Sequence, residues 1–181
     1  MIDEIMEYNR KFVENKGYEP YLTSKYPDKK LAILTCMDTR LLELLPAALG
    51  IKNGDAKIIK NAGGVIVHPY GSVVRSLLVG ILELGVEEVM VIGHTDCGVQ
   101  GMDGSEMLDM LVERGIDQQH IDIVRHSGVD LERWLGGFES VEISVHETVC
   151  RLKEHPLMPK DVRISGFIMD SATGELARVE A

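Results

Sequence analysis

The chain has no apolar stretch that approaches the roughly 20 residues needed to span a bilayer. Its start, Met1–Ile5, lacks the basic region and apolar run of a secretion signal. Positive charge is scarce, because 19 Lys and Arg stand against 29 Asp and Glu, a formal net charge of −10. Nucleic-acid affinity comes largely from Lys and Arg that displace counterions from phosphates, so nucleic-acid binding is disfavoured. We expect a cytoplasmic protein with no membrane and no nucleic-acid partner.

Cysteine is also scarce, since the chain has only three. Three cysteines cannot all pair, and a reducing cytoplasm disfavours stable disulfides. Metal ligation or thiol chemistry is therefore the better use of a well-placed cysteine. The 181 residues are enough to bury one core without disulfide staples. With no repeat or linker in sight, we expect a single domain over residues 1–181.

Short apolar runs alternate with helical patterns through the first half of the chain. Runs typical of strands covered on both faces occupy residues 31–35, 57–60 and 89–92. Helical spacing predicts helices over residues 41–49 and 72–84, between the strands. This alternation favours parallel strands joined by right-handed crossovers. The fold class predicted is α/β.

The flanking segments predict further elements. An amphipathic arm helix lies within residues 1–16, and because it has little sequence of its own to pack against, we expect it to pack on a partner subunit. Helices are predicted around 103–113 and 139–153, whereas 114–138 shows no clear pattern. Turn formers at 170–174 predict a hairpin that adds an antiparallel edge strand.

Three residues of metal-ligand type stand at predicted strand ends. Cys36 closes the first strand, while His94 and Cys97 follow the third. Ligands gather at the carboxyl ends of strands in open α/β sheets, so neighbouring first and third strands would bring the three together. Two thiolates and an imidazole suit Zn²⁺ and leave one tetrahedral position for water, as in catalytic zinc sites. The alternative is that Cys36 is a buried strand residue and that His94 and Cys97 only shape a loop.

Asp38 and Arg40 follow the first cysteine closely, in Cys36-Met37-Asp38-Thr39-Arg40. A planar, bidentate pair with Arg40 would keep Asp38 ionised. The carboxylate could then accept a hydrogen bond from metal-bound water. The alternative role for Asp38 is to cap the following helix, and the two roles can coexist.

Three other motif interpretations fail on spacing. Only three residues separate Cys36 from Arg40, too few for a phosphate-cradling thiol phosphatase loop. Asn61–Gly64 lacks the Gly-x-Gly-x-x-Gly pattern, so we interpret it as a tight passage from strand to loop. His146–Glu147 is not followed by a second histidine at metalloprotease spacing, because Cys150 stands there. Cys150 is interpreted as a buried helical residue.

The pair of motifs Cys36-x-Asp38-x-Arg40 and His94-x-x-Cys97 resembles that of β-class carbonic anhydrases of the compact prokaryotic type. The likeness extends from the first helix to the terminal hairpin. It implies one Zn²⁺ per chain, bound by the two cysteines and the histidine. It also implies a parallel sheet of order 2-1-3-4 with an antiparallel fifth strand and helices on both faces.

The resemblance further implies reversible hydration of carbon dioxide to bicarbonate and a proton by zinc-bound hydroxide. Asp38 and Arg40 would be the catalytic pair, and the backbone amide of Gly98 would bind a substrate oxygen. Such enzymes are homodimers or dimers of dimers with a narrow apolar pocket at the interface. In some members the matching aspartate moves onto zinc and stops turnover at lower pH, so the resting position of Asp38 stays open.

One departure concerns the segment before the first strand. Many members carry a substrate-binding glutamine there, whereas this chain has Lys25–Asp28, so we expect a missing or replaced contact and modest turnover. Two alternative functions stay open: hydrolysis of carbon disulfide or carbonyl sulfide, and a non-catalytic bicarbonate- or redox-sensing zinc module. His68 is a candidate for a proton shuttle, and the alternative is that it packs or lies on the surface, as a lone histidine more often does.

Overall fold

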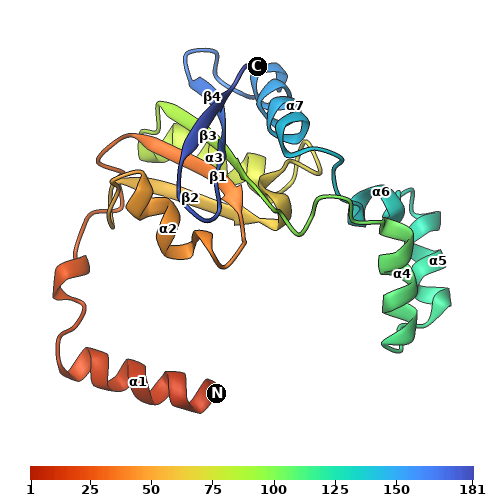
Figure 1. Ribbon diagram of the computed structural model, residues 1–181, viewed down its shortest axis with the longest axis horizontal. Coiled ribbons are helices and arrows are strands. Elements are labelled where there is room, and N and C mark those ends of the chain that lie inside the picture. The colour runs from red at the N-terminus through yellow and green to blue at the C-terminus, as the bar shows by residue number, and fades with distance from the viewer.

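The computed structural model describes residues 1–181 and is built around one five-stranded sheet (Figure 1). The strand order is β2-β1-β3-β4-β5, and every neighbouring pair is parallel except β4 and β5. The strands are β1 (Leu31–Cys36), β2 (Ala56–Asn61), β3 (Glu88–His94), β4 (Arg163–Met169) and β5 (Leu176–Val179). The α/β class, the sheet order and the antiparallel edge strand predicted from the sequence are confirmed.

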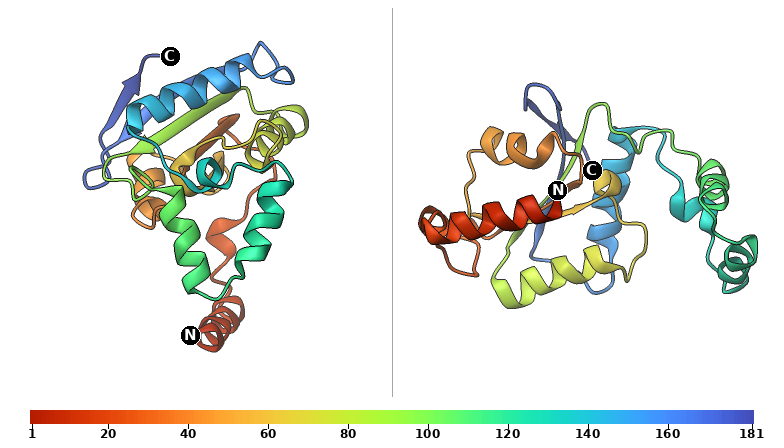
Figure 2. Two further views of the ribbon diagram at one scale, coloured as in Figure 1. Left: turned by 90° about the vertical axis from the view of Figure 1, so that its right-hand side faces the viewer. Right: turned by 90° about the horizontal axis from the view of Figure 1, so that it is seen from below.

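Helices cover both faces of this sheet, with α2 on one side and α3 and α7 on the other (Figures 1 and 2). No helix combines the length with the apolar composition that a membrane crossing requires. The helices are α1 (Ile2–Glu14), α2 (Leu41–Ala48), α3 (Ser72–Leu84), α4 (Gly104–Glu113), α5 (Gln118–His126), α6 (Leu131–Leu135) and α7 (Val141–Glu154), with short 3₁₀ turns η1 (Glu19–Tyr21) and η2 (Ala62–Gly64).

The unbroken apolar run of β1 supplies both layers of the core. Successive side chains of a strand point to opposite faces, so Ala32 and Leu34 join the cluster under α3 and α7, while Ile33 joins the cluster under α2. All three are at most 1% exposed. Burying an aliphatic side chain of the size of Ile33 or Leu34 contributes about 1.5–3 kcal/mol, so β1 is anchored from both sides. Its last residue, Cys36, therefore occupies a fixed position.

Two parts of the chain stand apart from the sheet and its covering helices (Figure 2). Helix α1 forms where the sequence predicts it, and none of its residues is buried. Helices α4, α5 and α6 form a separate unit around Leu108, Ile121 and Leu131. This helical unit is joined to the rest of the chain by two segments that meet at a bridge between Gln100 and Phe138. The packing of α1 on a partner stays a prediction.

Candidate metal centre

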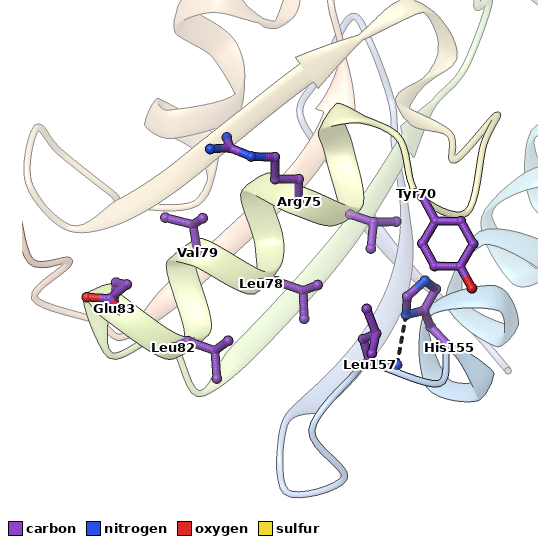
Figure 3. A pocket seen from close by; sticks show the side chains of 9 residues that line it. Tyr70, Arg75, Leu78, Val79, Leu82, Glu83, His155 and Leu157 are labelled. Carbon is purple, nitrogen blue, oxygen red and sulfur yellow. Dashed lines mark hydrogen bonds between the residues drawn. The ribbon is translucent and has the colours of Figure 1, made fainter.

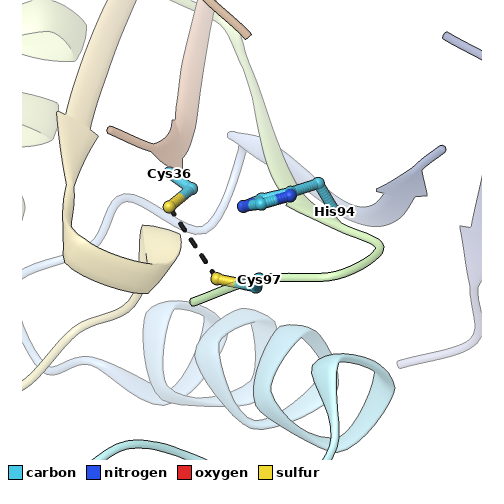
Figure 4. Close-up of side chains that lie close together, drawn as sticks. All are labelled: Cys36, His94 and Cys97. Atoms are coloured by element: carbon cyan, nitrogen blue, oxygen red, sulfur yellow. Dashed lines mark hydrogen bonds between the residues drawn. The ribbon is translucent and has the colours of Figure 1, made fainter. Parts of the chain in front are cut away.

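The three candidate ligands converge at the carboxyl end of the sheet. Strands β1 and β3 are parallel neighbours, so Cys36 at the end of β1 lies beside His94 at the end of β3. Cys97 returns toward both, and its Sγ is 3.9 Å from that of Cys36 (Figure 4). The ligand atoms of the three residues all lie within 4.8 Å of one another. The structure thus brings together the residues that the sequence analysis singled out.

This group fits a tetrahedral zinc ion. Zn–S bonds of about 2.3 Å place two sulfurs roughly 3.8 Å apart at a tetrahedral ion, close to the separation of the thiols here. The Nδ1 atom of His94 lies 2.9 Å from the carbonyl oxygen of Thr95, which can only accept, so Nδ1 carries the proton. Nε2 then presents its lone pair to the thiols, and it is buried with no hydrogen-bond partner. Such an unpaired buried nitrogen is costly unless a metal binds it.

Electrostatics at the thiols also favours a cation. Cys36 is 4% exposed and Cys97 is 6% exposed. Burial raises the pKa of the Cys97 thiol, and the neighbouring Cys36 raises it further, against the effect of a hydrogen bond from the Val99 amide. Two adjacent thiolates would repel each other in this setting. A bound divalent cation would stabilise both.

The turn that follows β2 packs directly against the end of β1. Asn61 closes this turn, because its side chain donates to the carbonyl of Val65 and accepts from the Val65 amide. A Cβ atom on Gly64 would lie 3.0 Å from the backbone nitrogen of Cys36, and Gly64 has φ +66°. Only glycine adopts this positive φ without strain and also leaves room for the backbone of Cys36. The tight passage predicted for Asn61–Gly64 is confirmed, and it packs against the backbone of the candidate ligand Cys36.

Asp38 and Arg40 form the expected bidentate pair beside the candidate ligands. Nε of Arg40 donates to Oδ1 of Asp38 at 3.0 Å, and Nη2 donates to Oδ2 at 2.8 Å. The hydrogen bond from Arg40 holds the pKa of the Asp38 carboxyl far below its usual range. Oδ2 of Asp38 is 3.9 Å from Nε2 of His94, so the carboxylate faces the ligand group. The backbone amide of Arg40 also donates to Oδ1 of Asp38. Because α2 begins at Leu41 and its N-cap residue is Arg40, Asp38 is not the cap of this helix, and the alternative role considered for it is wrong.

Asp96 is a contact of this pair that the sequence analysis missed. Nη1 of Arg40 donates to Oδ2 of Asp96 at 2.9 Å, and Nη2 donates to the Asp96 carbonyl oxygen at 2.8 Å. Arg40 and Asp96 are 56 positions apart in the sequence. The sequence pointed to Asp96 only through its position between His94 and Cys97. Its residue type did not indicate a contact with Arg40.

The structure also shows the surroundings of Gly98, His68 and Cys150. Gly98 directly follows Cys97, and a Cβ atom there would meet nothing within 4 Å, so close packing does not account for this glycine. His68 is outside the group of possible metal ligands, and its Nδ1 accepts from the Tyr70 amide. Cys150 lies on α7 as predicted but is half-buried, not buried, with its Sγ 3.9 Å from the His146 ring nitrogens.

A separate groove of about 440 Å³ runs along α3 (Figure 3). Its lining is mainly apolar and includes Leu78, Leu82 and Leu157, together with Tyr70 and His155. None of the candidate metal ligands lines it. The groove is therefore not part of the candidate metal centre.

The sequence and the fold of this chain are both similar to those of known proteins. Residues 31–176 match the protein family described as carbonic anhydrase. Putative carbonic anhydrase YvdA of Bacillus subtilis (strain 168) is 51% identical over 175 residues, 97% of this chain and 89% of the relative. The crystal structure of β-carbonic anhydrase isoform I from Trichomonas vaginalis superposes with a TM-score of 0.88 at 33% identity, covering 99% of this chain and 97% of that chain.

A second group of relatives carries a different name. The carbon disulfide hydrolase of Saccharolobus solfataricus is 32% identical over 163 residues, which are 83% of this chain and 78% of that protein. This similarity is well below that of YvdA.

Proposed function

The chain belongs to the carbonic anhydrase family, and on that premise we propose that it catalyses the reversible hydration of carbon dioxide to bicarbonate and a proton. The observation that carries the proposal is the buried Cys36–His94–Cys97 group with an unpaired Nε2, beside an ionised Asp38. The family is zinc-dependent, and this group would hold one Zn²⁺ per chain. Bound zinc lowers the pKa of a water molecule and so supplies a nucleophile near neutral pH.

The residues around the ligands prepare the site for this chemistry. The buried thiols of Cys36 and Cys97 and the fixed tautomer of His94 offer three ligands without rearrangement. Arg40 holds Asp38 as a carboxylate, so Asp38 is an acceptor that can orient the attacking water through a hydrogen bond. We assign the backbone amide of Gly98 as the donor to a substrate oxygen, because it follows Cys97 directly.

We further propose that the protein acts as a homodimer, alone or paired into a dimer of dimers. Support comes from α1, which has an apolar face with no covering in the single chain. We also propose a cytoplasmic location. Thiol ligands support that assignment, because a reducing compartment keeps Cys36 and Cys97 available for metal.

The relatives named carbon disulfide hydrolase define the main competing activity. They share about 30% of their residues with this chain, against about 50% for the Bacillus relatives named putative carbonic anhydrases. Greater similarity supports carbon dioxide as the substrate. Assays with both substrates on one preparation separate the two activities, because hydrolysis of carbon disulfide releases sulfide.

The decisive experiment is stopped-flow carbon dioxide hydration on protein of measured zinc content, from mildly acidic to alkaline pH. We expect one zinc per chain and a rate that rises with pH. Cys97→Ala should lose zinc and activity together, whereas Cys150→Ala, which removes a thiol from α7, should keep both. Full hydration by zinc-free Cys97→Ala would refute the assignment. Zinc-loaded protein that releases sulfide but does not hydrate carbon dioxide would replace it with the competing activity, and inert zinc protein would indicate a sensor.

A further inference from the structure

Arg40 is held along two edges of its guanidinium group. Nε and Nη2 donate to the two carboxylate oxygens of Asp38. Nη1 and Nη2 donate to Asp96, one to its carboxylate and one to its carbonyl oxygen. The guanidinium is planar and rigid, so fixing one edge fixes the direction of the other. The direction of the guanidinium edge that Asp38 binds therefore depends on where Asp96 holds Arg40.

The backbone of Asp96 has an unusual conformation that makes this possible. Its φ is +54°, in the left-handed region that residues other than glycine rarely adopt, although Asp and Asn tolerate it better than most. In this conformation the carboxylate and the carbonyl oxygen of one residue both reach Arg40. The strained residue lies between His94 and Cys97, where the chain must turn to bring both ligands to one point.

Stability does not account for this contact. The side chain of Asp96 is 86% exposed and that of Arg40 is 41% exposed. Ion pairs between exposed groups add little to folding, because water and salt screen them. Asp38, in contrast, is 16% exposed and lies 3.9 Å from Nε2 of His94. A carboxylate at that distance is a potential additional ligand for any metal that Nε2 binds.

We propose that Asp96 is a positioning residue, which anchors Arg40 so that Arg40 keeps Asp38 as a hydrogen-bond acceptor and prevents it from becoming a metal ligand. The inference rests on the proposed zinc site. Without the carboxylate of Asp96, Arg40 keeps a single charged anchor and can move together with Asp38. Asp38 would then bind the metal, which would hold the ion more tightly and occupy the position needed for water.

The test compares Asp96→Gly with Asp96→Asn in full-length, zinc-loaded protein. Glycine accommodates positive φ and keeps the carbonyl acceptor, so Asp96→Gly removes the carboxylate without forcing the backbone out of its conformation. Asparagine keeps a side-chain oxygen and tolerates the same backbone. The readouts are kcat for carbon dioxide hydration, the rate of zinc loss to a colorimetric chelator, and the melting temperature.

We expect Asp96→Gly to lower kcat roughly threefold to fivefold, the change that corresponds to one exposed ion pair. Zinc loss should slow by a similar factor, with little change in melting temperature. Asp96→Asn should stay near wild type. In the double variant Asp38→Asn/Asp96→Gly, zinc loss should return to the rate of Asp38→Asn alone, because the added ligand is gone.

Two results would overturn the proposal. One is wild-type kcat and zinc loss in Asp96→Gly. The other is faster zinc loss in Asp96→Gly, which would mean that Asp96 only stiffens the loop between His94 and Cys97. If the wild-type protein does not hydrate carbon dioxide at all, the proposed function fails, while the chelator comparison still tests the role of Asp96.

Discussion

Gly64 determines how closely the turn after β2 approaches Cys36. Gly64 and Gly50 have nearly the same positive φ, +66° and +62°. A Cβ atom on Gly64 would press on the backbone of Thr35 and Cys36 at 3.0 Å, whereas a Cβ atom on Gly50 would meet nothing within 4 Å. Substitutions at the two glycines therefore distinguish the effect of backbone strain, which both share, from the effect of contact with Cys36, which only Gly64 makes.

Gly50→Ala should cost about 1–2 kcal/mol of unfolding free energy from positive φ alone. Gly64→Ala should cost more and should also weaken zinc retention, because the methyl group displaces Cys36. Urea unfolding and zinc content measured on both variants test this. Equal zinc retention in the two variants would show that the turn does not support the ligand.

Asp38 allows a second residue-level prediction. Asp38→Ala should keep one zinc per chain, since the three proposed ligands remain, but should lose hydration rate, because no carboxylate orients the attacking water. From the usual contribution of such a group we expect a loss of about 10²–10⁴-fold. Zinc analysis and stopped-flow kinetics on one sample measure both quantities. Loss of zinc in Asp38→Ala would mean that Asp38 serves as a ligand in the resting protein.

Within the site, the sequence predicts the side chains that can be recognised from their residue type and their place relative to a strand. Cys36, His94 and Cys97 stand out because each is a ligand type at the end of a strand or just after it, and the structure brings them together. Asp96 was not predictable. Its contact depends on φ +54° and on an arginine 56 positions away, and neither follows from the residue type.

At the scale of elements, Asp170 organises the turn between β4 and β5. Its Oδ1 accepts from the amides of Ala172 and Thr173 and from the Thr173 hydroxyl. The bond from the Thr173 amide, followed by that from the Thr173 hydroxyl, lowers the pKa of Asp170. A carboxyl whose pKa is lower in the folded state adds stability above its unfolded pKa of about 4, and this stability is lost as pH falls toward the folded pKa.

Asp170→Ala should therefore lower the melting temperature at pH 7 by about 3 °C, a typical shift for one lost interaction in a chain of this size. The difference from wild type should shrink as pH falls below about 4, because the unfolded carboxyl then takes up its proton, and should be smallest below the lowered pKa of the folded state, where the carboxyl is protonated in both states. Thermal unfolding at several pH values measures this. Asp161→Ala, which removes another exposed carboxylate near β4, is the control. A difference that does not change with pH would mean that the charged form of Asp170 is not what holds the turn.

The elements that sequence analysis predicted well are those with a long periodic pattern. Helix α3 spans Ser72–Leu84 as predicted, and α7 buries Val145, Val149 and Leu152 on one face. Helices α5 and α6 were missed. They have 9 and 5 residues and bury one residue each, so their apolar periodicity is too short to recognise. These two helices are held in place by packing against Leu108 of α4. A pattern within a short segment does not reveal a contact between segments.

At the scale of the whole molecule, apolar side chains on α1 and on the helical unit face solvent. Ile2, Ile5 and Met6 on α1 are more than 60% exposed, and Ile123 and Trp134 of the helical unit are more than 50% exposed. Large exposed apolar surfaces usually mark an interface. A second copy of the chain would cover them in the proposed homodimer.

Met6→Lys should weaken the dimer, because it places a charge on the apolar face of α1. Glu4→Lys introduces the same side chain on the polar face and should leave the dimer intact. Sedimentation velocity over a range of protein concentrations measures the change, and hydration activity should fall with dissociation if the pocket lies at the interface. Dimers of equal strength in both variants would rule out the apolar face of α1 as a contact.

The bridge between Gln100 and Phe138 has a consequence for how this fold can vary. Phe138 accepts from Gly101 and Met102 accepts from Gly137, so the chain leaves the body and returns to it at one place. The helical unit between these two points has its own small core. The helical unit can therefore be lengthened, shortened or exchanged without a change in the register of β1 and β3. The carboxyl ends of β1 and β3, where the candidate metal ligands lie, are thereby insulated from changes in the helical unit.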